Sequence, residues 1–208
     1  MISLFLDTCN HNIIISLFND NKIVDSTFFE NDNNLSEKLL PNIKDLLDRN
    51  KISINKLNRI YISIGPGSFT GIRIGVAVAK VIAWSLNIDI IPISSLEVMA
   101  SINSFNKYIC PLIDARRGFV YAGLYDNDLN SILEDKYIKL DELKENLENN
   151  YEDITYVSYD KIDNTIKPNI DLEKIVLKHV NDSPINPHLV NPNYLKKTEA
   201  EEKNDNRN

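Results

Sequence analysis

The chain has 208 residues, and its 23 lysines and arginines against 30 aspartates and glutamates give a formal net charge of −7 at pH 7. A chain of this length can bury a core without disulfides or structural metals. Its acidity argues against a free-standing nucleic-acid-binding protein, because such proteins need clustered basic residues to neutralise phosphates. The most apolar stretch, Val81–Leu86, is preceded by Arg73 and Lys80, so we expect neither a membrane-spanning segment nor a membrane partner. The N-terminus lacks the pattern of a signal peptide, and we expect a cytoplasmic protein.

The first fifty residues predict an antiparallel meander and a helix. Segments rich in β-forming residues are separated by turns of asparagine and aspartate, which tolerate the positive φ angles of hairpins. The three predicted strands are Ile2–Leu6, Ile13–Phe18 and Lys22–Phe28. Leucines and isoleucines at helical spacing then predict a helix over Leu35–Leu47. Asn34 or Ser36 can cap its start, and Pro41 inside it should bend it.

A strand, a glycine-rich loop and a second helix follow. The strand is Ile60–Ile64, the loop is Gly65–Gly71, and Ile72–Leu86 predicts a helix that is apolar on nearly every side. A short strand, Asp89–Ile93, and a helix that begins at Ser94 or Ser95 complete this half of the chain.

The second half repeats the same coarse order of strands joined by tight turns, then helix and strand. Its predicted elements are the strands Tyr108–Ile113, Phe119–Tyr125, Lys136–Leu140 and Ile154–Ser158, an amphipathic segment Asp141–Leu147 and a charged helix Asp171–Val180. The excess acid lies here, since residues 101–208 carry 14 basic and 20 acidic side chains. We therefore predict an α/β protein with a first lobe over residues 1–102, a second and shorter lobe over 103–195, and a disordered tail over 196–208.

The glycine-rich loop allows two interpretations. It can be a tight turn in which Gly65 and Gly67 adopt unusual φ angles and Ser68 or Thr70 caps the helix. It can also bind an anion, because the N–H groups at a helix N-terminus favour phosphate. In the second interpretation a nucleotide or other anion would be held by Asp7, Thr8, Gly67, Ser68, Thr70 and Arg116.

The helix after this loop carries a ridge of small residues at intervals of four. A second backbone can approach closely along Gly71, Gly75, Ala79 and Ala83. The neighbour can be the sheet or the other helix of the same lobe, or it can be another protein if the two helices leave apolar surface uncovered.

Metal and nucleophile chemistry have little support in the sequence. Cys9 and Cys110 form no C-x-x-C pair and are expected to be buried, and the three histidines are too scattered to ligate one metal. No serine, cysteine or lysine stands beside a suitably placed histidine, so the sequence offers no nucleophile and base for a peptidase.

Several motifs, taken in order along most of the chain, resemble the TsaB family, also called YeaZ. They are Leu4–Thr8, Ser36–Pro41, Gly65–Gly75, Asp114–Arg116 with Gly118 and Tyr121, and Pro192–Tyr194. The resemblance implies an actin-like/Hsp70-like (ASKHA, ribonuclease H-like) fold of two related lobes. It also implies a degenerate relative of the catalytic protein TsaD, whose metal is held by two histidines on a helix of the first lobe. The corresponding helix here, Ser36–Arg49, contains no histidine.

The resemblance further implies a non-catalytic activating subunit in the synthesis of N6-threonylcarbamoyladenosine (t6A) in tRNA. Such a subunit binds TsaD through a helical bundle, is joined by the ATPase TsaE, meets tRNA only through the complex, and can form a homodimer when TsaD is absent. It binds no cofactor alone, although ATP or ADP and Mg²⁺ can be present in the complex. The implied partner interface is Leu39, Ile43, Leu46, Gly71, Ile72, Gly75, Val76, Ala79 and Ala83. The alternative function is an ASKHA-type ATPase or phosphotransferase.

Overall fold

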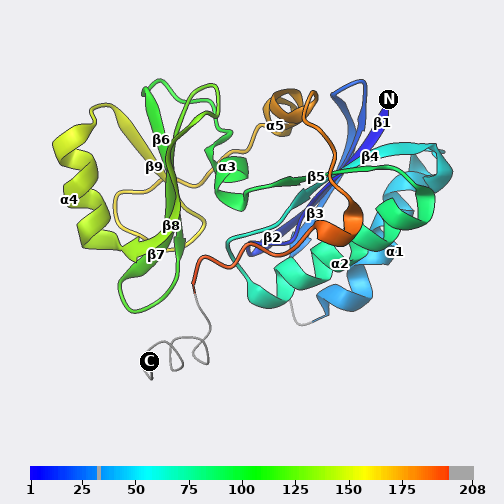
Figure 1. The fold of residues 1–208 in the computed structure, drawn as a ribbon, viewed down its shortest axis with the longest axis horizontal. Coiled ribbons are helices and arrows are strands. Elements are labelled where there is room, and N and C mark those ends of the chain that lie inside the picture. The colour runs from blue at the N-terminus through cyan, green and yellow to red at the C-terminus, as the bar shows by residue number, and fades with distance from the viewer. Residues whose placement is uncertain (32–33, 197–208) are drawn as a thin grey trace.

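Two β-sheets stand side by side along the long axis of the protein, each with helices against it (Figure 1). The computed structural model describes residues 1–31 and 34–196. The first sheet has the order β3-β2-β1-β4-β5. Its strands are β1 (Ile2–Asp7), β2 (Asn12–Asn19), β3 (Lys22–Glu30), β4 (Leu57–Ser63) and β5 (Asp89–Ile93). The first three form the predicted antiparallel meander, and β4 and β5 continue the sheet in parallel with β1.

The second sheet repeats this arrangement, with the order β8-β7-β6-β9. Its strands are β6 (Tyr108–Asp114), β7 (Phe119–Asp126), β8 (Ser131–Lys139) and β9 (Ile154–Val157). Strands β6, β7 and β8 are antiparallel neighbours, and β9 is parallel to β6. The repeated topology confirms the predicted α/β fold with two related lobes. Strand β8 begins five residues before the predicted Lys136.

Five helices and two short 3₁₀ turns complete the described part of the chain. They are α1 (Leu35–Arg49), α2 (Phe69–Leu86), α3 (Ser95–Ala100), α4 (Leu140–Asn150), α5 (Leu172–His179), η1 (Ile54–Lys56) and η2 (Pro187–Leu189). Helix α1 continues through Pro41. Helix α2 begins three residues before the predicted Ile72, because Ser68 caps it by accepting a hydrogen bond from the backbone N–H of Gly71.

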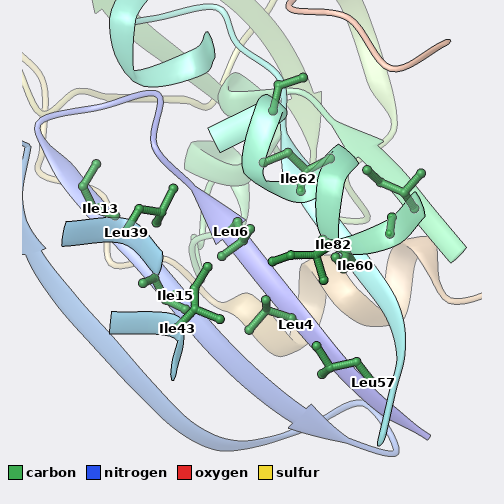
Figure 2. Close-up of a cluster of buried hydrophobic side chains, with 14 of the residues drawn as sticks. Leu4, Leu6, Ile13, Ile15, Leu39, Ile43, Leu57, Ile60, Ile62 and Ile82 are labelled. Carbon is green, nitrogen blue, oxygen red and sulfur yellow. The ribbon is translucent and has the colours of Figure 1, made fainter. Parts of the chain in front are cut away.

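The core of the first lobe lies between its sheet and the pair α1 and α2. Alternate residues of β1, β2 and β4 point to this face of the sheet, as the two-residue period of a strand requires. Figure 2 shows Leu4, Ile15 and Ile60 of the sheet together with Ile43 of α1 and Ile82 of α2. All five side chains are buried. The amphipathic pattern of α1 is thus explained by burial against the lobe's own sheet.

The opposite face of the first sheet belongs to a core that both lobes share. Phe5 and Tyr61 of the first sheet belong to one buried cluster with Tyr125 of the second sheet and with Ile175 and Val176 of α5. A separate cluster under α4 fills the far side of the second sheet. Because a single core spans the junction, α5 and the two sheets hold each other in place.

Helix α2 has the length and mean hydropathy of a membrane span, contrary to our expectation that no segment would. Its placement explains this composition. Ile72, Val76 and Ile82 are buried in the first lobe's core, as in an apolar helix that packs on a sheet. The two cysteines are buried, as predicted.

The chain returns to the first lobe after α5. The backbone N–H of Ile185 donates to the carbonyl of Ile90 in β5 at 3.2 Å, and Val190 is buried in the first lobe's core. The C-terminal part of the range assigned to the second lobe therefore packs on the first. Of the tail predicted to be disordered, residues 197–208 lie outside the described residues.

His179 connects the end of α5 to α3 and gives a testable pH dependence. Its ring nitrogens lie 2.8 Å from Glu97 Oε1 and 2.6 Å from Asp182 Oδ2. Burial lowers the pKa of His179, but its hydrogen bonds and charge interactions with Glu97 and Asp182 outweigh burial, so the net pKa is raised above 6.5. A raised folded-state pKa means that protonated His179 stabilises the fold below about pH 6.5, and that this contribution is lost as the pH rises through the folded-state pKa.

We therefore expect the free energy of unfolding of the wild type to fall with rising pH above about 6.5, and that of His179→Gln to fall less. Urea unfolding at a series of pH values measures both. The exposed His11 supplies the control variant, His11→Gln. Parallel pH profiles for the wild type and His179→Gln would contradict the assignment.

Candidate cleft and helix-pair face

A cavity of about 670 Å³ opens between the two lobes. The first lobe contributes the loop Cys9–His11 and the start of α2, and the second contributes the β6–β7 turn, Tyr121 and Tyr159. His11 Nε2 lies 3.1 Å from Asp160 Oδ1, so a polar contact crosses from one lobe to the other at this cavity. The cleft thus combines free helix N–H groups on one wall with a charged turn on the other.

The structure brings together four of the six residues proposed for an anion site. Gly67, Ser68, Thr70 and Arg116 all line the cleft. Gly65 and Gly67 have φ angles of 105° and 149°, as the turn interpretation predicted, and Arg116 also lies in the left-handed region at 69°. Asp7 and Thr8 do not line the cleft.

Asp7 lies behind the cleft wall at the end of β1. The side chain is 1% exposed, and its Oδ1 accepts a hydrogen bond from the backbone N–H of Cys9 at 2.8 Å. Its Oδ2 makes no hydrogen bond. Burial raises the pKa of Asp7 although hydrogen bonds to the carboxylate oppose the rise. The neighbouring Thr8 hydroxyl donates to the carbonyl of Gly71 at 2.7 Å, so Thr8 joins the end of β1 to the start of α2.

We expect Asp7→Asn to stabilise the protein at pH 7 by about 1 kcal/mol, because asparagine keeps the acceptor for Cys9 and removes a buried charge. A carboxyl with a raised folded-state pKa loses stability as the pH rises above 3.8, and the asparagine variant lacks this loss. Asp7→Ala is the matched control, and it should destabilise by about 1–3 kcal/mol because it leaves the Cys9 N–H without an acceptor. Urea unfolding measures the stability of both variants. If Asp7→Asn were less stable than the wild type, the carboxylate would be needed for folding.

The second candidate surface lies on the outer side of α1 and α2. An apolar groove of about 840 Å³ runs between α1, the segment 51–54 and Ile82 of α2. Leu40 and Ile54, which line it, are exposed, and so are Val81 at 63% and Trp84 at 65% on α2. We call Leu40, Ile54, Val81 and Trp84, with this groove, the helix-pair face. Isolated exposed apolar residues are ordinary, whereas a group of them along one groove is typical of an interaction site.

The nine residues implied for the partner interface are not among the exposed side chains of this face, although Ile43 also lines the groove. Every one is buried in the core of the first lobe: Leu39, Ile43, Leu46, Gly71, Ile72, Gly75, Val76, Ala79 and Ala83. A Cβ atom at Gly71 would overlap the carbonyl oxygen of Thr8, and one at Gly75 would overlap the Thr8 hydroxyl. The ridge of small residues therefore admits Thr8, which directly follows β1 of the same lobe.

The described residues contain no group of three or more histidine, cysteine, aspartate or glutamate side chains that could hold a metal ion. Helix α1 contains no histidine. The chemistry available at the two candidate surfaces is thus anion binding in the cleft and apolar association on the helix-pair face.

Comparisons with known proteins agree with this arrangement. Residues 30–165 match the family model described as "TsaD: tRNA N6-adenosine threonylcarbamoyltransferase". The chain is 34% identical over 164 residues to the tRNA threonylcarbamoyladenosine biosynthesis protein TsaB of Bacillus subtilis, a match that covers 77% of this chain and 72% of that protein. The chain belongs to the TsaB family. The Escherichia coli TsaB protein is 32% identical over 133 residues, covering 62% of this chain and 57% of its own length.

Solved structures show the same fold as this TsaB-family chain. The structure described as "an uncharacterized protein with similarity to peptidase YEAZ from Pseudomonas aeruginosa" superposes with a TM-score of 0.79 at 20% identity, covering 94% of this chain and 99% of that one. YeaZ from P. aeruginosa gives 0.73 at 18% identity. The resemblance found in the sequence motifs is therefore confirmed at the level of family and fold.

Proposed function

We propose that this chain is a non-catalytic activating subunit in t6A synthesis and that it binds TsaD through the helix-pair face. It supports transfer of a threonylcarbamoyl group to an adenosine of tRNA, which it meets through the complex. TsaE, as the ATPase, joins that complex in the cytoplasm. One observation carries the proposal. The chain belongs to a family named for tRNA threonylcarbamoyladenosine biosynthesis, and its paired helices carry an exposed apolar groove.

The chemistry of the helix-pair face favours a partner of the same fold. The matching family model is that of TsaD, so TsaD and this chain are relatives that share the two-lobed fold. A relative possesses an equivalent pair of helices, and helices pack by setting the side chains of one into the groove of another. In such a bundle, the groove between α1 and Ile82 would receive a helix of TsaD.

The non-catalytic role rests on the position of the polar side chains. Asp7 is buried, does not line the cleft, and accepts a hydrogen bond from the backbone N–H of Cys9. Three metal ligands do not converge anywhere in residues 1–31 and 34–196. We propose that the chain binds no cofactor alone and that any ATP, ADP or Mg²⁺ belongs to the assembled complex.

Reconstitution tests this function. Purified TsaD, TsaE, tRNA and a threonylcarbamoyl donor are combined with and without the chain, and t6A is measured by mass spectrometry of the digested tRNA. We expect t6A to form only when the chain is present, and a complex with TsaD to appear by light scattering. Equal t6A yields in both reactions would overturn the proposal.

The cleft supports a second candidate, an ATPase or phosphotransferase. Gly67, Ser68 and Thr70 at the start of α2 face Arg116 across a cavity large enough for a nucleotide. Calorimetry of the isolated chain with Mg-ATP, followed by a phosphate-release assay, separates the two functions. Tight binding with turnover would establish the second candidate, and the activating subunit requires neither.

A homodimer that uses the helix-pair face is expected when TsaD is absent, because the same apolar side chains would otherwise remain exposed. Light scattering over a range of concentrations measures it. A chain that stays monomeric at high concentration would contradict the homodimer without affecting the proposed binding to TsaD.

A further inference from the structure

The C-terminal segment Pro187–Lys196, which we call the strap, lies along one side of α2 (Figure 1). Three side chains of α2 hold it, and they lie at intervals of seven and four residues, which places them on one stripe of the helix. Arg73 Nε donates to the hydroxyl of Tyr194 at 2.8 Å. Lys80 Nζ donates to the carbonyl of Val190 at 2.8 Å, and the Trp84 ring lies edge-on to His188 with centroids 6.1 Å apart.

The strap is anchored at both ends and in its middle. At one end Phe69, Arg73 and Tyr194 are stacked, with the Arg73 guanidinium 3.8 Å from the centre of the Phe69 ring and the two aromatic rings 5.0 Å apart. In the middle Val190 is completely buried. The N–H of Asn193 donates to the carbonyl of Ile64 at 2.8 Å. The basic side chains Arg73 and Lys80 are therefore committed to the strap.

This attachment places Leu189 beside the helix-pair face. Leu189 is 69% exposed, and it follows His188, which contacts the Trp84 ring. The exposed Trp84 of α2 thus meets the strap at His188, next to the exposed Leu189.

We propose that the strap forms one flank of the surface that receives TsaD, and that Leu189 and Trp84 together contact the partner. This inference rests on the proposed function and names which part of the chain completes the docking surface. The α1 groove lies on one side of Val81 and the strap on the other, because Ile82 lines the groove while Trp84 contacts His188.

The dimensions of a helix support a partner that reaches both sides. A helix with its side chains is about 10–12 Å wide, and the axes of packed helices lie about 8–10 Å apart. A partner helix laid in the α1–α2 groove over Val81 therefore extends over the neighbouring stripe of α2 and meets Trp84 and Leu189. The ring contact between Trp84 of α2 and His188 of the strap is the observation that assigns the strap to the same partner as the helix-pair face.

Titration calorimetry of TsaD into the full-length chain tests the inference. We expect Leu189→Asp to raise the dissociation constant at least about tenfold, and the uncharged Leu189→Ser to raise it by a smaller factor. Leu177 on α5, which is 51% exposed and outside the helix-pair face, gives the control Leu177→Asp, for which we expect no more than about a twofold change. Thermal unfolding of each variant establishes that it is folded.

The outcomes separate the strap from the proposed function. If Leu189→Asp binds TsaD as tightly as the wild type while a charge at Val81 abolishes binding, the strap inference is overturned and the docking function stands. If neither variant weakens binding, the helix-pair face is not the docking surface. If Leu189→Asp disrupts only a homodimer in light scattering, the occupant is a second copy of this chain, and the inference is overturned for TsaD.

Discussion

Replacing Val81 with arginine should weaken binding to TsaD at least about 100-fold, because each factor of ten corresponds to about 1.4 kcal/mol and an unpaired charge buried in an apolar contact costs several kcal/mol. Val81 lies on the exposed side of α2, between the groove on one side and Trp84 on the other, and it is 63% exposed. The free chain should keep its stability, since arginine at an exposed helical position remains in water. Titration calorimetry gives the dissociation constant, and urea unfolding gives the stability.

Phe28 offers a matched control, because it is also 63% exposed. It lies on β3 and pairs with Ile14, a residue of the core shared by the two lobes, so it points to the face of the sheet opposite α1 and α2. Phe28→Arg should bind TsaD as the wild type does. Equal losses for Val81→Arg and Phe28→Arg would show that added charge, and not the helix-pair face, is responsible.

Local patterns in the sequence determine most of the elements. The β-forming residues of Ile13–Phe18 and the asparagine- and aspartate-rich turn at Asn19–Asn21 predict a hairpin, and the hairpin forms. Gly65 and Gly67 predict left-handed φ angles, and both have them. These predictions succeed because a turn depends on residues that are adjacent in the chain.

The exposed face of α2 could not be identified from apolar content, because this helix is apolar on nearly every side. The spacing of the polar residues identifies the exposed side of α2. Thr70, Arg73 and Lys80 recur at intervals of three and seven, and Ala77 and Trp84 continue the same stripe. That stripe is the exposed one, whereas Gly71 and Gly75 lie on the opposite side. The small residues that the sequence analysis assigned to a partner surface are buried in this chain.

The strap could not be predicted for a different reason. Pro187–Lys196 has no hydrophobic period, and its position depends on contacts with residues more than 100 positions earlier in the chain. Arg73 and Lys80 alone would fit a weakly basic partner surface equally well. Only the folded chain shows that these two cations bind Tyr194 and the carbonyl of Val190.

Gly71→Ala should destabilise the protein more than any other substitution proposed, by about 3 kcal/mol or more, which is at or beyond the upper end of the usual cost of overpacking a core. A methyl group at Gly71 would overlap the carbonyl oxygen of Thr8, and the backbone of this buried residue, directly after β1, cannot move aside cheaply. Gly75→Ala should also destabilise, but its methyl group meets the hydroxyl of the Thr8 side chain. Urea unfolding measures both.

A second substitution at Thr8 distinguishes the two glycines. Thr8→Ala alone should cost about 1 kcal/mol, because it removes the hydrogen bond to the carbonyl of Gly71. It also removes the hydroxyl that obstructs Gly75, so Thr8→Ala should partly rescue Gly75→Ala and give a favourable coupling energy in the double-mutant cycle. Gly71→Ala should not be rescued, since the Thr8 carbonyl remains. Rescue of both glycines, or of neither, would contradict the close packing of α2 on β1. That packing is also why a large residue at Gly75 or Ala79 would test the folding of the first lobe and not its binding to TsaD.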